Sequence, residues 1–325
     1  MKLLLIGGTR FSGRALTGLA LERGHDVTVF HRGTGDEDPW PDAEHVHGDR
    51  ADGFGVLAGR SFDAVADMCG YVPRELRASC AAFSDAGLYA FVSSLSVHRD
   101  DARPGATEDD DVYGPPFPDT EEIREDTYGP LKVASEVAVR DAFGERALVV
   151  RPGLIVGPND PTDRFTYWVR RVAVGGEVLT PAPPDYPVQW IDARDLAAFV
   201  LSLCERAIGG TYSVVGPPVA IEQLMNTCRN ERGSDAAFTW VPKAFLDEHG
   251  VTAWSDLPLW IPDLPGLNRF NATRAVAAGL QTRPLASTVA DTLAWDRERP
   301  QEWPMKAGLA PEREREILTA WHAVA

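Results

Sequence analysis

The chain has 325 residues, 44% of them hydrophobic, and carries a formal net charge of −16 at pH 7. This length allows a full-sized hydrophobic core and a smaller second lobe. The excess of acidic side chains argues against binding to nucleic acid or to anionic membrane surfaces. There is no apolar run of about eighteen residues, and the N-terminus enters an apolar stretch at once. We therefore predict no membrane span, no signal peptide and a cytoplasmic location.

The cysteine and histidine pattern does not predict a metal site. Four cysteines are widely scattered, with no C-x-x-C pair: Cys69, Cys80, Cys204 and Cys228. This scatter favours free thiols over disulfides or zinc ligands. His45 and His47 flank Val46 and are expected on one strand face, but two histidines alone do not make a site.

The first thirty residues predict a strand, a glycine-rich turn, a helix and a second strand. Residues 3–6 are all apolar, as in a strand that is buried on both faces of a parallel sheet. Apolar and small residues then recur at helical spacing from Phe11, and Gly24 supplies a stop. Val27, Val29 and Phe30 then indicate a second strand. The whole stretch predicts one βαβ unit.

The glycines of this unit predict a phosphate-binding turn. Gly7 permits a tight turn, Gly8 is expected to leave the backbone bare for a ligand, and Gly13 lets the helix pack closely on the sheet. Backbone N–H groups and the helix dipole favour an anion at this helix N-terminus. A dinucleotide pyrophosphate fits these requirements.

Two arginines favour NADP over NAD as the cofactor. Arg32 follows the second strand directly, and no acidic residue occurs after it until Asp36. An arginine at this position accommodates a 2′-phosphate, whereas NAD sites carry an acid there. Arg10, inside the glycine turn, offers a second guanidinium for an extra phosphate. The alternative for Arg32 is an ordinary exposed arginine at a strand end.

The rest of the chain predicts a Rossmann-type, doubly wound parallel α/β sheet with a smaller C-terminal substrate-binding lobe. Further strands are expected at 45–49, 62–68, 88–94, 147–155 and 210–215, and helices at 74–86, from about 127, and at 165–174. The segment 99–126, rich in Asp and Pro, is expected to be a loop. We assign residues 1–158 plus about 188–216 to the dinucleotide-binding domain, and about 159–187 plus 217–325 to the substrate-binding lobe.

Tyr128 and Lys132 are the candidate catalytic pair. Four residues apart on a helix, they stand on the same face. An ammonium one turn away favours the phenolate of a tyrosine whose ordinary pKa is about 10, so Tyr128 can exchange a proton with a substrate oxygen. Ser94, at a strand end, is expected to hydrogen-bond that oxygen. Ser96 is the runner-up on the same side, and Ser93 is expected on the other.

These motifs resemble those of the extended or atypical short-chain dehydrogenases/reductases (SDRs) of the NAD-dependent epimerase/dehydratase type. The resemblance rests on GGTRFSG, VSSLSVH, YGPLK, RPGLIVGP and QWIDARD, and runs from Met1 to about Ser202, more faintly through 279–295. Arg10 stands where the middle glycine of the family pattern belongs. The resemblance implies that Asp49 bonds the adenine ring. The cofactor contacts it implies are Gly7, Gly8, Thr9, Arg10, Phe11, Gly13, Arg32, Asp49, Tyr128 and Lys132.

In this family one site runs either net redox chemistry or a transient oxidation followed by epimerisation or dehydration. Nucleotide-sugar members usually carry an arginine where this chain has Val188, which weakens a nucleotide-sugar reading. Three arginines are candidates for an anionic substrate, although exposed helix arginines are the plainer interpretation: Arg164, Arg170 and Arg171.

We therefore predict an enzyme that transfers hydride between NADP(H), or NAD, and a ketone or secondary alcohol of a small metabolite. The first alternative is an NAD(P)-dependent epimerase or dehydratase that acts on a sugar or nucleotide-linked substrate. The second is a non-catalytic nucleotide-sensing or RNA-associated protein, which the net charge opposes. A homodimer is the default oligomeric state, by analogy with the family.

Overall fold

The apolar N-terminal run forms β1 (Lys2–Ile6) of a seven-stranded parallel sheet. The next two strands along the chain are added on one side of β1, and the later strands are added on its other side. The computed structural model describes residues 1–34, 39–99, 102–300 and 303–324; Asp36 lies outside these ranges. Within them the sheet order is β11-β6-β5-β4-β1-β2-β3. The other strands are β2 (Asp26–His31), β3 (Glu44–His47), β4 (Ala64–Asp67), β5 (Leu88–Val92), β6 (Ala147–Pro152) and β11 (Gly210–Val214). The predicted α/β Rossmann-type fold is confirmed.

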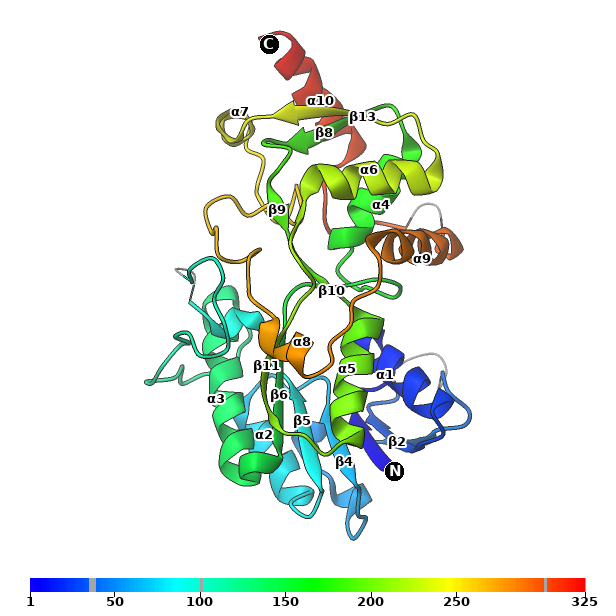
Figure 1. Cartoon of the computed structure of the whole chain (residues 1–325), viewed down its shortest axis with the longest axis vertical. Coiled ribbons are helices and arrows are strands. Elements are labelled where there is room, and N and C mark those ends of the chain that lie inside the picture. The colour runs from blue at the N-terminus through cyan, green and yellow to red at the C-terminus, as the bar shows by residue number, and fades with distance from the viewer. Residues whose placement is uncertain (35–38, 100–101, 301–302, 325) are drawn as a thin grey trace.

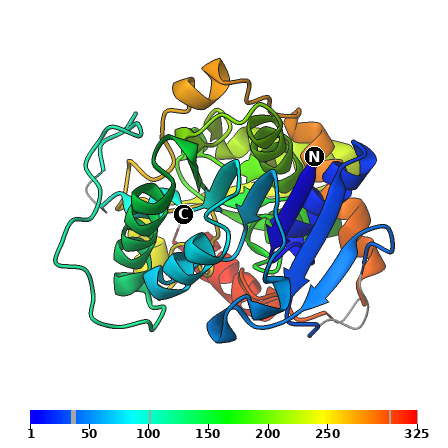
Figure 2. The same cartoon turned by 90° about the horizontal axis from the view of Figure 1, so that it is seen from below.

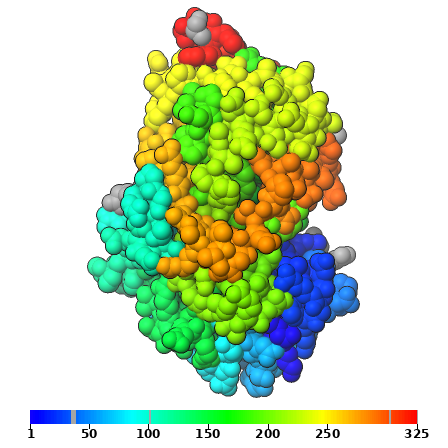
Figure 3. Space-filling model, in the orientation of Figure 1, coloured from blue at the N-terminus to red at the C-terminus, as the bar shows by residue number. Residues whose placement is uncertain are grey.

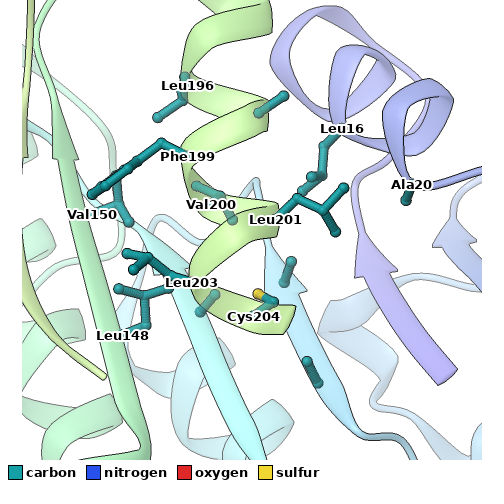
Figure 4. Close-up of a cluster of buried hydrophobic side chains, with 14 of the residues drawn as sticks. Leu16, Ala20, Leu148, Val150, Leu196, Phe199, Val200, Leu201, Leu203 and Cys204 are labelled. Atoms are coloured by element: carbon teal, nitrogen blue, oxygen red, sulfur yellow. The ribbon is translucent and has the colours of Figure 1, made fainter. Parts of the chain in front are cut away.

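Helices cover both faces of this sheet, as Figures 1 and 2 show. Alternate residues of β1 serve opposite faces, since Leu3 and Leu5 belong to one buried cluster whereas Leu4 and Ile6 belong to another. The first cluster includes residues of α1 (Phe11–Glu22) and α5 (Ala193–Glu205), which pack together in Figure 4. The second includes residues of α2 (Pro73–Ala82) and α3 (Glu125–Phe143). The unbroken apolar run at 3–6 follows from burial on both faces.

Several predicted elements have other bounds in the structure, among them α2, which ends at Ala82, and β4, which spans Ala64–Asp67; two further differences are informative. The helix expected from about Thr127 begins at Glu125, because the Thr127 hydroxyl accepts the N–H of the N-cap residue Arg124 at 2.9 Å. The strand expected at 147–155 is divided at Gly153 into β6 and β7 (Ile155–Val156). Only β6 belongs to the main sheet, and β7 pairs with β10 (Ile191–Asp192).

The C-terminal half of the chain builds a second lobe with a core of its own, which includes Trp168 and Trp260. Its strands are β8 (Glu177–Pro181), which pairs with β13 (Ala237–Val241), and β9 (Pro187–Val188), which pairs with β12 (Val219–Ala220). Its helices are α4 (Arg164–Val174), α6 (Ile221–Arg232), α7 (Lys243–Glu248), α9 (Leu285–Glu298) and α10 (Pro311–His322). In Figure 1 this lobe lies above the parallel sheet. The division into two domains stays a proposal.

A segment from the second lobe returns across the junction of the lobes. Its backbone bonds the loop that precedes α3, since Gly105 donates to the Arg269 carbonyl at 2.6 Å and Asn271 donates to the Ala106 carbonyl at 2.9 Å. It continues into α8 (Thr273–Ala277), which lies beside β11 and is visible in orange on the surface in Figure 3. The two lobes are thereby tied together on the side of β11.

Candidate active site

The glycine turn after β1 is closely packed. Gly7 has a φ of +84°, and a Cβ at this position would lie 2.6 Å from the Cys69 sulfur. A Cβ at Gly13 would overlap the Gly7 carbonyl oxygen, so the helix can approach the turn only with glycine there. These observations agree with the roles expected for Gly7 and Gly13.

The role expected for Gly8 is wrong. Gly8 is buried, and a Cβ there would lie 2.7 Å from the Thr17 hydroxyl oxygen and 2.9 Å from a Val29 methyl carbon. The missing side chain would therefore collide with the protein interior, and it does not keep the backbone bare for a ligand. The Thr17 hydroxyl instead donates to the Gly8 carbonyl at 2.7 Å and fixes the turn.

The N-terminus of α1 is suited to an anion. The N-cap residue, Arg10, is extended, and among the described residues no side chain caps this helix end. Its first N–H groups are thus available to phosphate oxygens, with the helix dipole in the favourable direction. Arg10 and Arg32 are both exposed, while Thr9 and Phe11 are partly buried in the same turn. These features fit a dinucleotide pyrophosphate.

Substituting Gly13 tests the turn. We expect Gly13→Ala to abolish detectable cofactor binding, because the added methyl must push α1 away from the Gly7 carbonyl. We expect it to cost about 1–3 kcal/mol of stability, as overpacking does. Gly55→Ala, with no positive φ and no atom within 4 Å of its Cβ, is the control for a glycine substitution outside the turn. Fluorescence titration and thermal denaturation measure both effects; unaltered cofactor affinity in Gly13→Ala would contradict the assignment.

Lys132 is buried beneath the carboxyl ends of β4 and β5. Its ammonium donates to the Gly70 carbonyl at 2.7 Å and to the Val92 carbonyl at 3.0 Å. It lies 4.8 Å from the ring centroid of Tyr71 and 5.8 Å from that of Tyr128. Burial lowers the pKa of Lys132 to about 8. The two carbonyls leave one of its three N–H donors for a ligand hydroxyl.

Ser94 and Tyr128 come together, one from the end of β5 and one from the first turns of α3. The pKa of Tyr128 is raised by burial, lowered by its hydrogen bond with the Ser94 side chain, and raised again by the nearby Tyr71. The net direction is upward, so without cofactor Tyr128 is a protonated phenol. The Lys132 ammonium donates to the two carbonyls, and the phenolate expected from the sequence stays a prediction.

The three serines have distinct surroundings. The Ser94 and Ser96 hydroxyls are 3.1 Å apart on the exposed side of the turn that follows β5. Ser93 is buried and donates to the Glu136 carboxylate at 2.6 Å. Of these three hydroxyls, that of Ser94 is the one that lowers the pKa of Tyr128, which places it beside the phenol. This geometry supports Ser94 as the candidate, with Ser96 next to it.

A buried ion cluster behind the site was missed by the sequence reasoning. Glu136, fully buried one turn beyond Lys132, accepts two bonds from Arg151 of β6, at 2.9 and 2.8 Å, and one from Arg140 at 2.7 Å. With its bond from Ser93, Glu136 links α3 to both β5 and β6. The sequence did offer one indication of this cluster, because Glu136 follows Lys132 by four residues and therefore lies on the same buried face of the helix.

Asp49 and its neighbour Arg50 lie at the end of β3. The Asp49 carboxylate accepts the Ala51 N–H at 2.9 Å and caps a short helical turn, and its contact with adenine stays a prediction. Arg50 forms a bidentate pair with the buried Asp67 of β4, at 2.9 and 2.8 Å. Asp67 also accepts the Tyr89 hydroxyl at 3.0 Å. This pairing fixes β4 just before Cys69, which packs against Gly7.

Comparisons with known proteins agree with this architecture. A model of the NAD dependent epimerase/dehydratase family matches residues 76–215, which include Ser94, Tyr128 and Lys132. A UDP-Glc/GlcNAc 4-epimerase from Campylobacter jejuni superposes with a TM-score of 0.70 at 13% identity, over 92% of this chain and 99% of that one. A UDP-glucuronic acid 4-epimerase from Bacillus cereus, in complex with NAD, gives 0.66 at 12% identity, over 92% and 99%.

A curated relative comes from a plant. The chain is 26% identical over 252 residues to the chloroplast stem-loop binding protein of 41 kDa b of Arabidopsis thaliana. The alignment covers 71% of this chain and 63% of the relative. The chain thus matches less than two thirds of that relative's length.

The family model matches the part of the chain that carries Ser94, Tyr128 and Lys132, as the motifs predicted, and the fold is similar to that of solved epimerases. The prediction of an NAD(P)-dependent SDR-like enzyme is confirmed at this level. No helix in the described part of the chain is both long and apolar enough to cross a membrane.

Proposed function

We propose that the protein is an NAD(P)-dependent epimerase or dehydratase that oxidises a secondary alcohol of a sugar or nucleotide-linked substrate and then returns the hydride. The observation that carries this proposal is the meeting of Ser94, Tyr128 and Lys132 at the carboxyl edge of the sheet, where ligands collect in open α/β folds. The net ketone or alcohol reductase predicted first from the sequence has less support. The fold neighbours named above are UDP-sugar 4-epimerases.

Each side chain has a defined task in this chemistry. The bound cofactor supplies a hydride acceptor and donor. Tyr128 exchanges a proton with the substrate oxygen, and Ser94 hydrogen-bonds the same oxygen and orients the carbon that bears it. Lys132 offers its remaining N–H to a hydroxyl beside Tyr128. Tyr128, as the phenolate, would accept the substrate hydroxyl proton while hydride leaves for the cofactor, and its phenol would give that proton back to the carbonyl oxygen when the hydride returns.

Product analysis tests the reaction type. The purified protein is incubated with catalytic NAD or NADP and with UDP-glucose or UDP-glucuronate, and the sugar is followed by proton NMR. We expect a new epimer, or a dehydrated sugar, without stoichiometric NAD(P)H. Stoichiometric accumulation of reduced cofactor would contradict transient oxidation and restore the net oxidoreductase.

Arg32 carries the finer prediction of an NADP preference. It is exposed and directly follows β2, where the ribose 2′ position is expected. We expect Arg32→Ala to lower the NADPH to NADH affinity ratio about tenfold, the effect of losing roughly one charge-assisted bond to phosphate. Arg297→Ala, an arginine on α9 of the second lobe, is the control. An unchanged ratio in fluorescence titrations would remove this assignment.

RNA binding is a second candidate, favoured by the name of the Arabidopsis relative. The net charge of −16 opposes it, because affinity for nucleic acid comes largely from phosphate neutralisation by basic side chains. Gel-shift titration with a stem-loop RNA at several salt concentrations decides the question. Tight binding that weakens steeply with salt would support this candidate; no shift at low salt would exclude it for that RNA.

A further inference from the structure

The three arginines of α4 differ sharply in what they contact. Arg170 forms a bidentate pair with Asp296, at 2.7 and 2.6 Å, and Arg171 donates to the buried Glu314 at 2.5 Å. Both therefore hold the second lobe together. Arg164, at the start of the same helix, makes no ion pair with any of the described residues.

Arg164 is instead placed against an aromatic ring. Its guanidinium carbon lies 4.6 Å from the ring centroid of Trp254, and the residue is partly buried. A guanidinium stacked on an indole keeps its in-plane N–H donors for a planar oxyanion. Stacking also reduces the side-chain freedom that would be lost on binding.

The neighbouring carboxylate of Asp160 has one oxygen without a hydrogen-bond partner among the described residues. Asp160 is 1% exposed, and its Oδ1 accepts the N–H and the hydroxyl of Thr162, both at 2.8 Å. Its Oδ2 is buried and has no hydrogen-bond partner. Asp160 and Arg164 are close enough for each charge to shift the pKa of the other group: Arg164 lowers that of Asp160, and Asp160 raises that of Arg164. A ligand hydroxyl would satisfy this oxygen, which is otherwise costly to bury.

This pair lies at the start of α4, on the side of the second lobe that faces the junction of the lobes. Phe165, next to Arg164, packs on Trp190 with ring centroids 5.3 Å apart. Ile191, next to Trp190, donates to the Leu154 carbonyl at 2.9 Å, just beyond the carboxyl end of β6. In Figure 1 the N-terminal end of α4 points toward the junction of the lobes.

We propose that Arg164 and Asp160 anchor a hydroxylated, anionic part of the substrate, with Arg164 on the oxyanion and Asp160 Oδ2 on a hydroxyl. The oxyanion is the diphosphate of a nucleotide sugar or the carboxylate of an acidic sugar. This inference rests on the proposed function for the identity of the site. Val188, where related nucleotide-sugar enzymes were expected to carry an arginine, is a fully buried valine, and so Arg164 supplies the cation from another element.

Isothermal titration of Arg164→Gln tests the anchor. The protein is first saturated with NADH, so that an added diphosphate cannot enter the cofactor turn, and then titrated at constant ionic strength with UDP or with glucuronate. We expect about tenfold weaker binding of one of the two probes, as for the loss of a charge-assisted bond, and NADH affinity within about twofold of wild type. Loss for UDP identifies the diphosphate, and loss for glucuronate identifies the sugar carboxylate.

Two further variants keep this result interpretable. Arg164→Lys retains the charge without the planar fork, so its affinity should fall between those of wild type and Arg164→Gln. Arg315→Gln, on exposed α10, should bind like wild type. Equal probe affinity in wild type and Arg164→Gln, or no binding of either probe to NADH-loaded wild type, would overturn the anchor. Wild type that retains no nicotinamide nucleotide after purification and also binds no added NADH would count against the proposed function instead.

Discussion

Tyr128→Phe is expected to lower kcat by about 10²–10⁴-fold, the usual contribution of a positioned general acid or base. The substitution removes the only atom of this side chain that can exchange a proton, and it keeps the ring, which lies 6.4 Å from the Tyr71 ring and 5.8 Å from the Lys132 ammonium. Cofactor affinity should therefore remain close to that of wild type. Initial rates on the identified substrate and fluorescence titration with NAD(P)H measure the two quantities.

Tyr71→Phe is the matched control, because Tyr71 is also a phenol beside Lys132, with a ring centroid 4.8 Å from the ammonium. We expect it to change kcat far less than Tyr128→Phe does, since it is the pKa of Tyr128 that the Ser94 side chain lowers. A variant Tyr128→Phe with full turnover would show that the proton is handled elsewhere. A comparable loss in Tyr71→Phe alone would transfer the role to Tyr71.

Glu136→Gln is expected to lower the free energy of unfolding by about 3–5 kcal/mol at pH 7, as the loss of one partner from a buried ion pair does. The amide cannot neutralise Arg151, which is 3% exposed and bonds both oxygens of the carboxylate. Chemical denaturation of both proteins measures the difference. Glu312→Gln, a solvent-exposed glutamate paired with Arg315 on α10, is the matched control and should lose less than about 1 kcal/mol.

The pH dependence of this difference has a definite sign. Burial alone would raise the pKa of Glu136, but the bonds and charge of Arg151, together with Arg140 and Ser93, lower it overall. A carboxylate with a lowered folded-state pKa stabilises the protein above its unfolded-state pKa, about 4.3, and loses this contribution as the pH falls. The gap between wild type and Glu136→Gln should therefore narrow below about pH 4.3. A gap that widens there would contradict the ion-pair account.

The parts of the fold that depend on local pattern could be predicted from the sequence. The run at 3–6 has no polar alternation because both faces of β1 are covered, and Leu3 and Leu4 indeed enter different clusters. Tyr128 and Lys132 were brought together by helical spacing alone. The break between β6 and β7 was not visible, because the change of pairing partner at Gly153 depends on β10, whose Ile191 lies far along the chain.

The parts of the site that depend on distant residues could not be predicted. Glycine spacing does not show which side of Gly8 is turned toward the protein interior, and so the close contact of Gly8 with Thr17 was missed. The Lys132 ammonium is held by carbonyls 62 and 40 residues away in the chain. The arginines of α4 also have distant partners, because the carboxylates that pair with Arg170 and Arg171 are 126 and 143 residues further along the chain. The sequence therefore could not distinguish these two paired arginines from Arg164.

The exchangeability of the cofactor tests the central claim, transient oxidation within one site, most directly. The purified protein is gel-filtered and denatured, the released nucleotide is identified, and a second sample is titrated with NADPH and NADH by fluorescence. We predict that nicotinamide nucleotide stays with the protein and exchanges slowly, because hydride must return to the same substrate before the cofactor leaves. Empty protein that binds and releases NADPH freely, and oxidises it in proportion to a ketone, would contradict the claim and identify a reductase.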